Sequence, residues 1–277
     1  MIEKYYDGAI EQVAAGLGTV EKNHLLVRYS GQFSVENLND TKQLEKNEDI
    51  FVQVHEFETG EITCAYEPYL TMICDGFRRY MTGTFEEFME TCDVYYLHRP
   101  VLLGYFNQDN TGREEIILLD EVAYEQERML AALERMLCAI ADRHPVLFVL
   151  NRFQLASKST MQLTARFLKC ENCNIGLVLG VSDIQAMPEF LVPDWEMLYE
   201  TLDDGSKIYH IGNSGRKKEE TIDDEKYVDY GSEKVYRKLQ NMVEFLDFDQ
   251  AAYYLETIER KIKFDNLLVD DAARFRM

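Results

Sequence analysis

Apolar residues in the second half of the chain alternate between helical and strand spacing. Over residues 121–143 they recur every three or four positions, as on one face of a long helix, until a His-Pro pair interrupts the pattern. A continuous apolar run of strand length follows at 146–150, and then come a second helical pattern at 159–168 and a second buried run at 175–181. Alternating helices and strands predict a parallel sheet with crossover helices.

The first half of the chain predicts further helices and strands of the same α/β class. Thr84 stands where a helix begins, and Glu87 three residues later completes a capping box. Apolar runs bounded by turn residues indicate strands, and apolar residues at helical spacing indicate helices. The expected elements are a helix at 3–15, strands at 24–29 and 49–54, and helices at 68–81 and 85–92.

The composition changes after a last predicted strand at 207–211. Polar and glycine-containing residues follow this strand, which is typical of a domain boundary, and residues beyond 228 have apolar positions at helical spacing. We expect two antiparallel helices joined at 247–249, which either dock on the α/β domain or precede further repeats. The predicted organisation is an α/β domain at 1–212, a linker at 213–227 and a TPR-like helical hairpin at 228–277.

The composition also limits the partners and the location of the protein. Hydrophobic residues make up 46% of the 277 residues, which is enough for a sizeable core. The formal net charge of −21 repels phosphate backbones and anionic lipid, so we expect no direct contact with nucleic acid. No apolar run approaches the roughly 18 residues of a membrane span, no signal segment opens the chain, and the cysteines lack the density of a secreted disulfide scaffold. We therefore expect a cytoplasmic protein without membrane contact.

The segment that begins at residue 144 carries a family resemblance. Its buried strand ends in Asn151-Arg152, an aromatic-containing turn follows, and a helix capped by small residues leads to the strand at 175–181, while Tyr66-Glu67-Pro68-Tyr69 opens an earlier helix. This arrangement resembles the Walker B and sensor region of the STAND branch of AAA-like ATPases, bacterial regulatory ATPases of the kind followed by TPR-like helical repeats. The resemblance covers residues 1–212. It implies a P-loop NTPase-like parallel sheet with flanking helices, followed by a short all-helical C-terminal element.

The chain departs from this family in the phosphate-binding loop. A Walker A loop, G-x-x-x-x-G-K-[ST], surrounds the phosphates with backbone N–H groups, while its Lys offsets their charge and its hydroxyl binds Mg²⁺. If Gly31 is the first glycine, then Glu36, Asn37 and Leu38 stand at the positions of the second Gly, the Lys and the Ser or Thr. A carboxylate at the second glycine position repels a triphosphate.

The Walker B positions depart from the family pattern as well. Asn151 and Arg152 occupy the positions of the two acidic residues, so no carboxylate there holds Mg²⁺ or polarises water. We therefore expect no catalytic residue and no metal ligand. The residues expected to line what remains of a nucleotide pocket are Gly31, Ser34, Asn151 and Arg152, with Arg152 pairing with a phosphate in place of the lost Lys.

Two other groups of residues leave alternatives open. Residues 116–119 are apolar and directly precede Asp120-Glu121, which by itself satisfies a Walker B pattern. The other interpretation is that Asp120 caps the long helix and Glu121 lies in its first turn. Cys170 and Cys173 have the spacing of half a metal site, but no second pair accompanies them, which favours a thiol pair in a surface loop.

Three hypotheses about function follow. The first is a regulatory pseudo-ATPase, a signalling scaffold that lacks functional Walker A and Walker B residues, needs no cofactor, and binds a protein partner or a second copy of itself through its C-terminal helices. The second is an active or nucleotide-sensing ATPase that binds ATP or ADP and uses Asp120-Glu121 with an atypical phosphate loop. The third is a helical-repeat protein-interaction module whose functional surface is residues 228–277.

Overall fold

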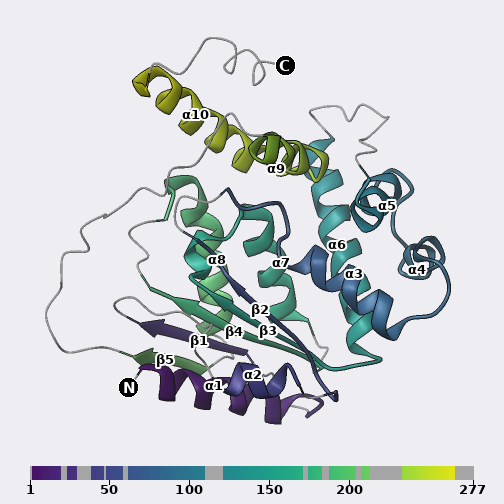
Figure 1. The fold of residues 1–277 in the computed structure, drawn as a ribbon, viewed down its shortest axis with the longest axis vertical. Helices are drawn as coiled ribbons and strands as arrows, with labels where there is room; N and C mark the ends of the chain where they lie inside the picture. Colours follow the sequence, from purple (N-terminus) through teal and green to yellow (C-terminus); the bar gives the residue numbers. More distant parts are fainter. Residues whose placement is uncertain are drawn as a thin grey trace, which may run out of the picture.

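Within the described residues, five parallel strands form one sheet in the order β2-β3-β4-β1-β5 (Figure 1). The computed structural model describes residues 2–19, 24–29, 39–46, 48–58, 62–109, 121–170, 174–182, 187–203, 207–211 and 233–265. The strands are β1 (His24–Tyr29), β2 (Phe51–Glu56), β3 (Val146–Asn151), β4 (Ile175–Val181) and β5 (Lys207–Ile211). The prediction of a parallel α/β sheet is confirmed.

The interior strands β3 and β4 explain the continuous apolar runs of the sequence. Every residue of β3 and β4 is buried, because helices cover both faces of a parallel sheet. β2 begins and ends two residues later than predicted, since Phe51 pairs with Val146 and Glu56 pairs with Asn151. Its polar end, His55-Glu56, is tolerated in the sheet because β2 is an edge strand with half-buried side chains.

Helices form a layer on each face of the sheet (Figure 1). On one face lie α1 (Ile2–Gly16) and α2 (Asn39–Leu44), and on the other lie α6 (Val122–Ala141), α7 (Lys158–Lys169) and α8 (Val192–Asp203), with α3 (Tyr69–Tyr80) packed against α6. The strand side chains divide between two apolar clusters accordingly. α1 approaches β4 closely because Gly176 has no side chain: a Cβ there would lie 2.8 Å from Cγ1 of Val13.

The capping box predicted at Thr84 is confirmed. The Thr84 hydroxyl accepts a hydrogen bond from the Glu87 N–H at 3.2 Å, and the Glu87 carboxylate accepts one from the Thr84 N–H at 2.8 Å. These bonds satisfy N–H groups that the first turn of α4 (Phe85–Thr91) cannot bond internally. The start of this helix is therefore fixed by local sequence.

Among the described residues, the α-helices α2, α5 (Arg99–Asn107) and α8 were not predicted, and each has a local reason. α2 has only six residues, too few to show a period. α5 has apolar residues on consecutive positions, because it is packed on more than one side. α8 begins with Val192-Pro193, and a residue before proline is usually extended, although proline is well tolerated in the first turn of a helix.

The C-terminal helices form a hairpin that docks on the α/β part of the molecule (Figure 1). α9 (Glu233–Glu244) and α10 (Phe248–Asp265) are joined at residues 245–247, two residues earlier than predicted. The Lys238 ammonium donates to the Ile62 carbonyl at 2.6 Å, and the Asn241 side-chain oxygen accepts from the Ala65 N–H at 3.0 Å. Docking is thus the arrangement observed, while the predicted linker at 213–227 lies outside the described residues.

The hairpin also completes the N-terminus of α7. Ser157 caps this helix by accepting from the Thr160 N–H at 3.2 Å. Two further N–H groups of the first turn donate to the hairpin: the Ser159 N–H to an Asp247 carboxylate oxygen at 3.1 Å, and the Lys158 N–H to the Gln250 side-chain oxygen at 3.3 Å. Because these groups have no partner within the helix, the hairpin supplies bonds that α7 lacks.

Candidate functional site

A group of polar side chains lies where four of the parallel strands end. Parallel strands end on the same edge of a sheet, and in open α/β sheets ligands bind in the crevice outside those carboxyl ends. We call this group the carboxyl-edge cluster. Its members are Tyr29 of β1, Glu56 of β2, Asn151 at the end of β3 with Arg152 and Gln154 after it, and Ser182 directly after β4.

The centre of the carboxyl-edge cluster is a buried hydrogen bond between β1 and β3. The Tyr29 hydroxyl donates to Oδ1 of Asn151 at 2.6 Å, and both side chains are buried. β4 lies between these strands, so the two side chains meet across it. Val178 of β4 packs on the same face as these two side chains, and Gly180, two residues later on β4, lies on that face as well.

The Tyr29 phenol is held in its neutral form. Burial, opposed by the positive charge of Arg152 and increased by the negative charge of Glu56, raises the pKa of Tyr29 to about 12. The hydroxyl therefore keeps its proton at neutral pH and serves as a donor. The pair with the Asn151 amide is a neutral hydrogen bond with no general base among its two members.

Arg152 leaves β3 in an unusual backbone conformation. Its φ is 53° and its ψ is 40°, the left-handed region that residues with a side chain rarely adopt, and the chain then turns into the short 3₁₀ helix Phe153–Leu155. The guanidinium Nε lies 3.6 Å from a carboxylate oxygen of Glu56 on β2. Their side chains remain 29% and 21% exposed, so a soluble anion can reach Arg152 in competition with Glu56.

A second hydrogen-bonded pair ties the end of β4 to the turn after β3. The Gln154 side-chain nitrogen donates to the Ser182 hydroxyl oxygen at 2.8 Å, and the Ser182 N–H donates to the Gln154 side-chain oxygen at 3.4 Å. Ser182 also forms a hydrogen bond with Tyr29, and this bond lowers the pKa of Tyr29 against the effect of burial. The strand ends are thus linked by one network of neutral hydrogen bonds with a single ion pair beside it.

The structure brings together two of the four predicted pocket residues. Asn151 and Arg152 lie at the carboxyl edge of the sheet, whereas Gly31 and Ser34 lie outside the described residues, as does Asp120. Glu121 precedes α6 by one residue instead of lying in its first turn, and its side chain makes no capping bond.

Sequence reasoning missed four members of the cluster. These are Tyr29, Glu56, Gln154 and Ser182. The signal available in the sequence was their position at, or just after, the end of a predicted strand. Glu56 matters most, because it brings a carboxylate to the strand ends although the Walker B positions have none, and Arg152 neutralises that carboxylate.

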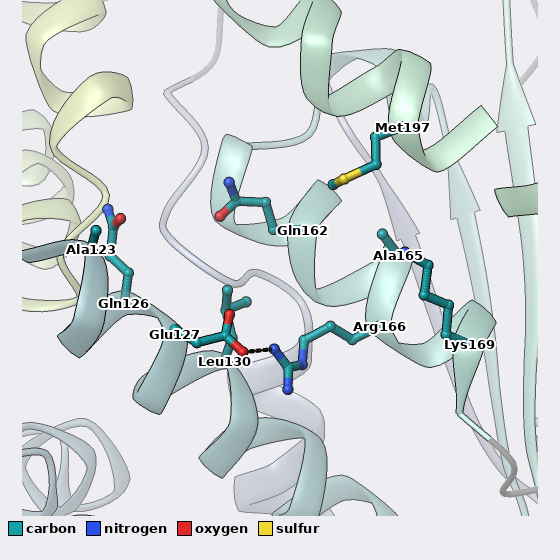
Figure 2. Close-up of a pocket in the computed structure, with 9 residues that line it drawn as sticks. All are labelled: Ala123, Gln126, Glu127, Leu130, Gln162, Ala165, Arg166, Lys169 and Met197. Carbon is teal, nitrogen blue, oxygen red and sulfur yellow. Dashed lines mark hydrogen bonds and ion pairs between the residues drawn. The ribbon is translucent and has the colours of Figure 1, made fainter. Parts of the chain in front are cut away.

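An open pocket lies apart from the strand ends, between helices α6, α7 and α8 (Figure 2). Its volume is about 310 Å³, and its walls include Gln126, Glu127, Gln162, Arg166 and Met197. Arg166 bonds to Glu127 across the pocket and to Glu134 beyond it, so its charge is already matched by two carboxylates. Lys169 also lines this pocket, so its charged walls combine the paired Arg166 with a second cation from α7.

Neither a protein-family model nor a curated protein sequence matches the chain. Among the residues that the structure describes, no three His, Cys, Asp or Glu side chains gather as they would around a metal ion. No described helix has both the length and the apolar content that a membrane span requires.

Proposed function

We propose that this chain is a regulatory scaffold with a P-loop NTPase-like fold, which does not hydrolyse nucleotide and acts in the cytoplasm through protein contacts. The observation that carries the proposal is the 2.6 Å hydrogen bond from Tyr29 to Asn151. It fills, with neutral groups, the strand end at which an ATPase of this type needs carboxylates for Mg²⁺ and water.

The order of the strands supports a binding site at this place. β1 connects to β2 past β4 and β3, whereas β4 connects to β5 on the opposite side of β1. Neighbouring strands whose connections run in opposite directions create a crevice between their carboxyl ends. Tyr29 ends one of these strands and Ser182 follows the other, so the cluster borders the crevice.

The charges of the cluster support binding of an anion without turnover. Glu56 is the one carboxylate of the cluster, and it is paired with Arg152. A nucleotide phosphate that reached Arg152 would replace Glu56 as its partner, which keeps a charge-assisted hydrogen bond but provides no second carboxylate for Mg²⁺. Retained binding of ATP or ADP would make the scaffold a nucleotide sensor.

The hairpin supports the protein-contact part of the proposal. Tyr236 and Val243 lie two turns apart on α9 and therefore on one face, and they are 49% and 47% exposed. Large apolar side chains grouped on an exposed helix face are typical of contacts with a partner helix or a second copy. We call Tyr236 and Val243 the outer α9 face.

The test combines phosphate release and calorimetry on the full chain. We expect no ATP-dependent phosphate release above the buffer background, with or without Mg²⁺. If calorimetry detects binding of ATP or ADP, we expect the same affinity with and without Mg²⁺. The affinity should be weakened several-fold in Arg152→Gln. It should be unchanged in the matched control Arg78→Gln, whose side chain is exposed on α3.

Mg²⁺-dependent phosphate release would overturn the proposal. If that release disappeared in Asp120→Asn but persisted in Asp142→Asn, a matched change directly after α6, the acidic pair at 120–121 would be the working Walker B. Nucleotide binding without phosphate release would identify a nucleotide sensor. If calorimetry detected no heat of binding, the chain would be a scaffold that binds no nucleotide.

A further inference from the structure

Two cysteine side chains face each other at the ends of α6 and α7. Cys138 lies in the last turn of α6, and Cys170 is the first residue after α7. Their sulfur atoms are 3.5 Å apart, within hydrogen-bond distance, and both side chains are partly exposed. The sequence suggested a pair with Cys173, which lies outside the described residues, whereas the structure brings Cys170 to Cys138.

The helices are held in the register that brings these thiols together. Arg166 lies one turn before Cys170 on α7, and Glu134 lies one turn before Cys138 on α6. The Arg166 guanidinium donates to the Glu134 carboxylate at 2.7 Å and also pairs with Glu127. Residues four apart lie on the same helix face, so the ion pair and the thiol pair are successive contacts along one interface.

We propose that Cys138 and Cys170 form a reversible disulfide by exchange with a low-molecular-weight disulfide. The geometry carries this inference: two partly exposed thiols, with sulfurs 3.5 Å apart, on helices already fixed against each other by an ion pair. The inference does not depend on the proposed scaffold function. In a reducing compartment such a disulfide forms transiently, as in redox-sensing proteins.

The exchange proceeds in two balanced steps. The Cys170 thiolate attacks one sulfur of the reagent RSSR, the reagent's S–S bond breaks, and RS⁻ leaves and takes up the proton that Cys170 lost. Cys138 then gives up its proton, and its thiolate attacks the Cys170 sulfur of the mixed disulfide. The second RS⁻ leaves and takes up that proton, so two protein thiols are oxidised and one RSSR is reduced to two RSH.

The environments of the cysteines favour this order and this pair. The hydrogen bond with Cys170, together with burial, raises the pKa of the Cys138 thiol, which disfavours the Cys138 thiolate. Burial raises the pKa of Cys74 to about 12 and that of Cys92 to about 11. These two side chains are also buried, and a buried thiol is protected from a soluble reagent.

The cross-link would act on the part of the fold that carries the candidate site. It joins residues that lie 32 positions apart, and the segment between them contains β3, the 3₁₀ turn and α7. Closing this segment into a loop restricts the unfolded chain and so stabilises the folded one. It also fixes one end of the α6–α7 interface beside Lys169, which lines the pocket of Figure 2.

The test is oxidation of the reduced full chain with excess oxidised glutathione. The reaction is stopped with N-ethylmaleimide and mapped by mass spectrometry of a non-reduced digest. We expect a peptide pair that links Cys138 to Cys170, a rise in Tm of roughly 5 °C or more, and reversal of both by dithiothreitol. In Cys138→Ser the reaction should stop at the mixed disulfide between Cys170 and glutathione, and Tm should not rise.

Matched variants decide between the pairs of cysteines. Cys173→Ser and Cys64→Ser should both keep the cross-link, because neither residue takes part in it. Cys138→Ala repeats the test if circular dichroism shows that Cys138→Ser is misfolded. A cross-link between Cys170 and Cys173, or a Cys138 that remains open to N-ethylmaleimide in the oxidised protein, would overturn the proposal.

Discussion

The buried amide of Asn151 determines the chemistry of the carboxyl edge. Its side chain is fully buried, and a neutral amide in such a place needs only hydrogen bonds. A carboxylate there would have to recruit a cation or a proton, because an isolated buried charge is very costly. The Tyr29 hydroxyl donates a hydrogen bond to the Asn151 amide. This hydroxyl stays protonated at neutral pH, since burial raises the pKa of Tyr29 to about 12. The pair is therefore built for stability and not for proton transfer.

Removing the Tyr29 hydroxyl should cost stability without changing the shape of the side chain. We expect Tyr29→Phe to lower the free energy of unfolding by about 1–3 kcal/mol, because the buried Asn151 amide loses the hydrogen bond that the Tyr29 hydroxyl donates to Oδ1. Urea unfolding followed by circular dichroism measures this difference. Tyr124→Phe is the matched control, since that side chain is 72% exposed. Equal unfolding midpoints for the two variants would show that the Tyr29 bond contributes nothing.

At the scale of elements, the start of α7 depends on the hairpin. Asp247 is buried at the turn between α9 and α10 and accepts from the Ser159 N–H at 3.1 Å. We expect Asp247→Ala to lower the free energy of unfolding by about 1–3 kcal/mol, because that N–H is left unbonded. Asp247→Asn keeps an acceptor oxygen and should cost less. The measurement is urea unfolding of both variants, and an equal cost would argue that the hydrogen bond is not the cause.

The contribution of Asp247 to stability should depend on pH, because its carboxyl group titrates. Burial raises the pKa of Asp247 above its ordinary value of 3.8, against the opposing effects of Ser159, Gln250 and Lys158. The folded state therefore binds the proton more tightly than the unfolded state. The stabilisation that comes from this tighter proton binding is complete below pH 3.8, and it is lost as the pH rises through the pKa of Asp247 in the folded state. The stability of the wild type relative to Asp247→Asn should fall as the pH rises from 4 toward 7. A rise instead would mean that the hydrogen bonds outweigh burial and lower the pKa.

The elements themselves were predictable where local sequence decides them. β1, β4 and β5 have their predicted bounds: β1 and β4 are largely apolar runs, and β5 is a short segment followed directly by glycine and polar residues. The predicted bounds of β2 were two residues too early, because the observed bounds follow from pairing with β3. Which strands pair with each other cannot be read from the sequence. The long helix and the capping box at Thr84 rest on periodicity and on contacts within a few residues, which a sequence does show.

The candidate site was predictable only in part, for the same reason. Asn151 and Arg152 could be named because they directly follow the buried run of β3. Their partners, Tyr29 and Glu56, come from strands more than ninety positions earlier in the chain, and only the strand order β2-β3-β4-β1 brings these side chains to Asn151 and Arg152.

At the scale of the whole molecule, net charge and the outer α9 face act in opposite directions. The charge of −21 repels a second copy, whereas Tyr236 and Val243 offer apolar surface that contact with another helix would bury. Salt screens the repulsion and leaves the apolar attraction in place. If the hairpin joins two copies, association should therefore strengthen as salt is added, the opposite of what a contact held by ion pairs would show.

Because association through the outer α9 face should strengthen with added salt, the salt dependence of self-association is a specific test of the hairpin surface. We expect light scattering of the full chain to report a mass that rises toward a dimer as NaCl increases from about 50 to 500 mM, because the Debye length falls over that range. The double change Tyr236→Ser and Val243→Ser should keep the mass of a single chain at both salt concentrations. Tyr124→Ser removes an even more exposed aromatic ring from α6 and should leave the association intact. If both variants behave alike, the contact lies elsewhere, and the outer α9 face would then be surface that a different protein covers.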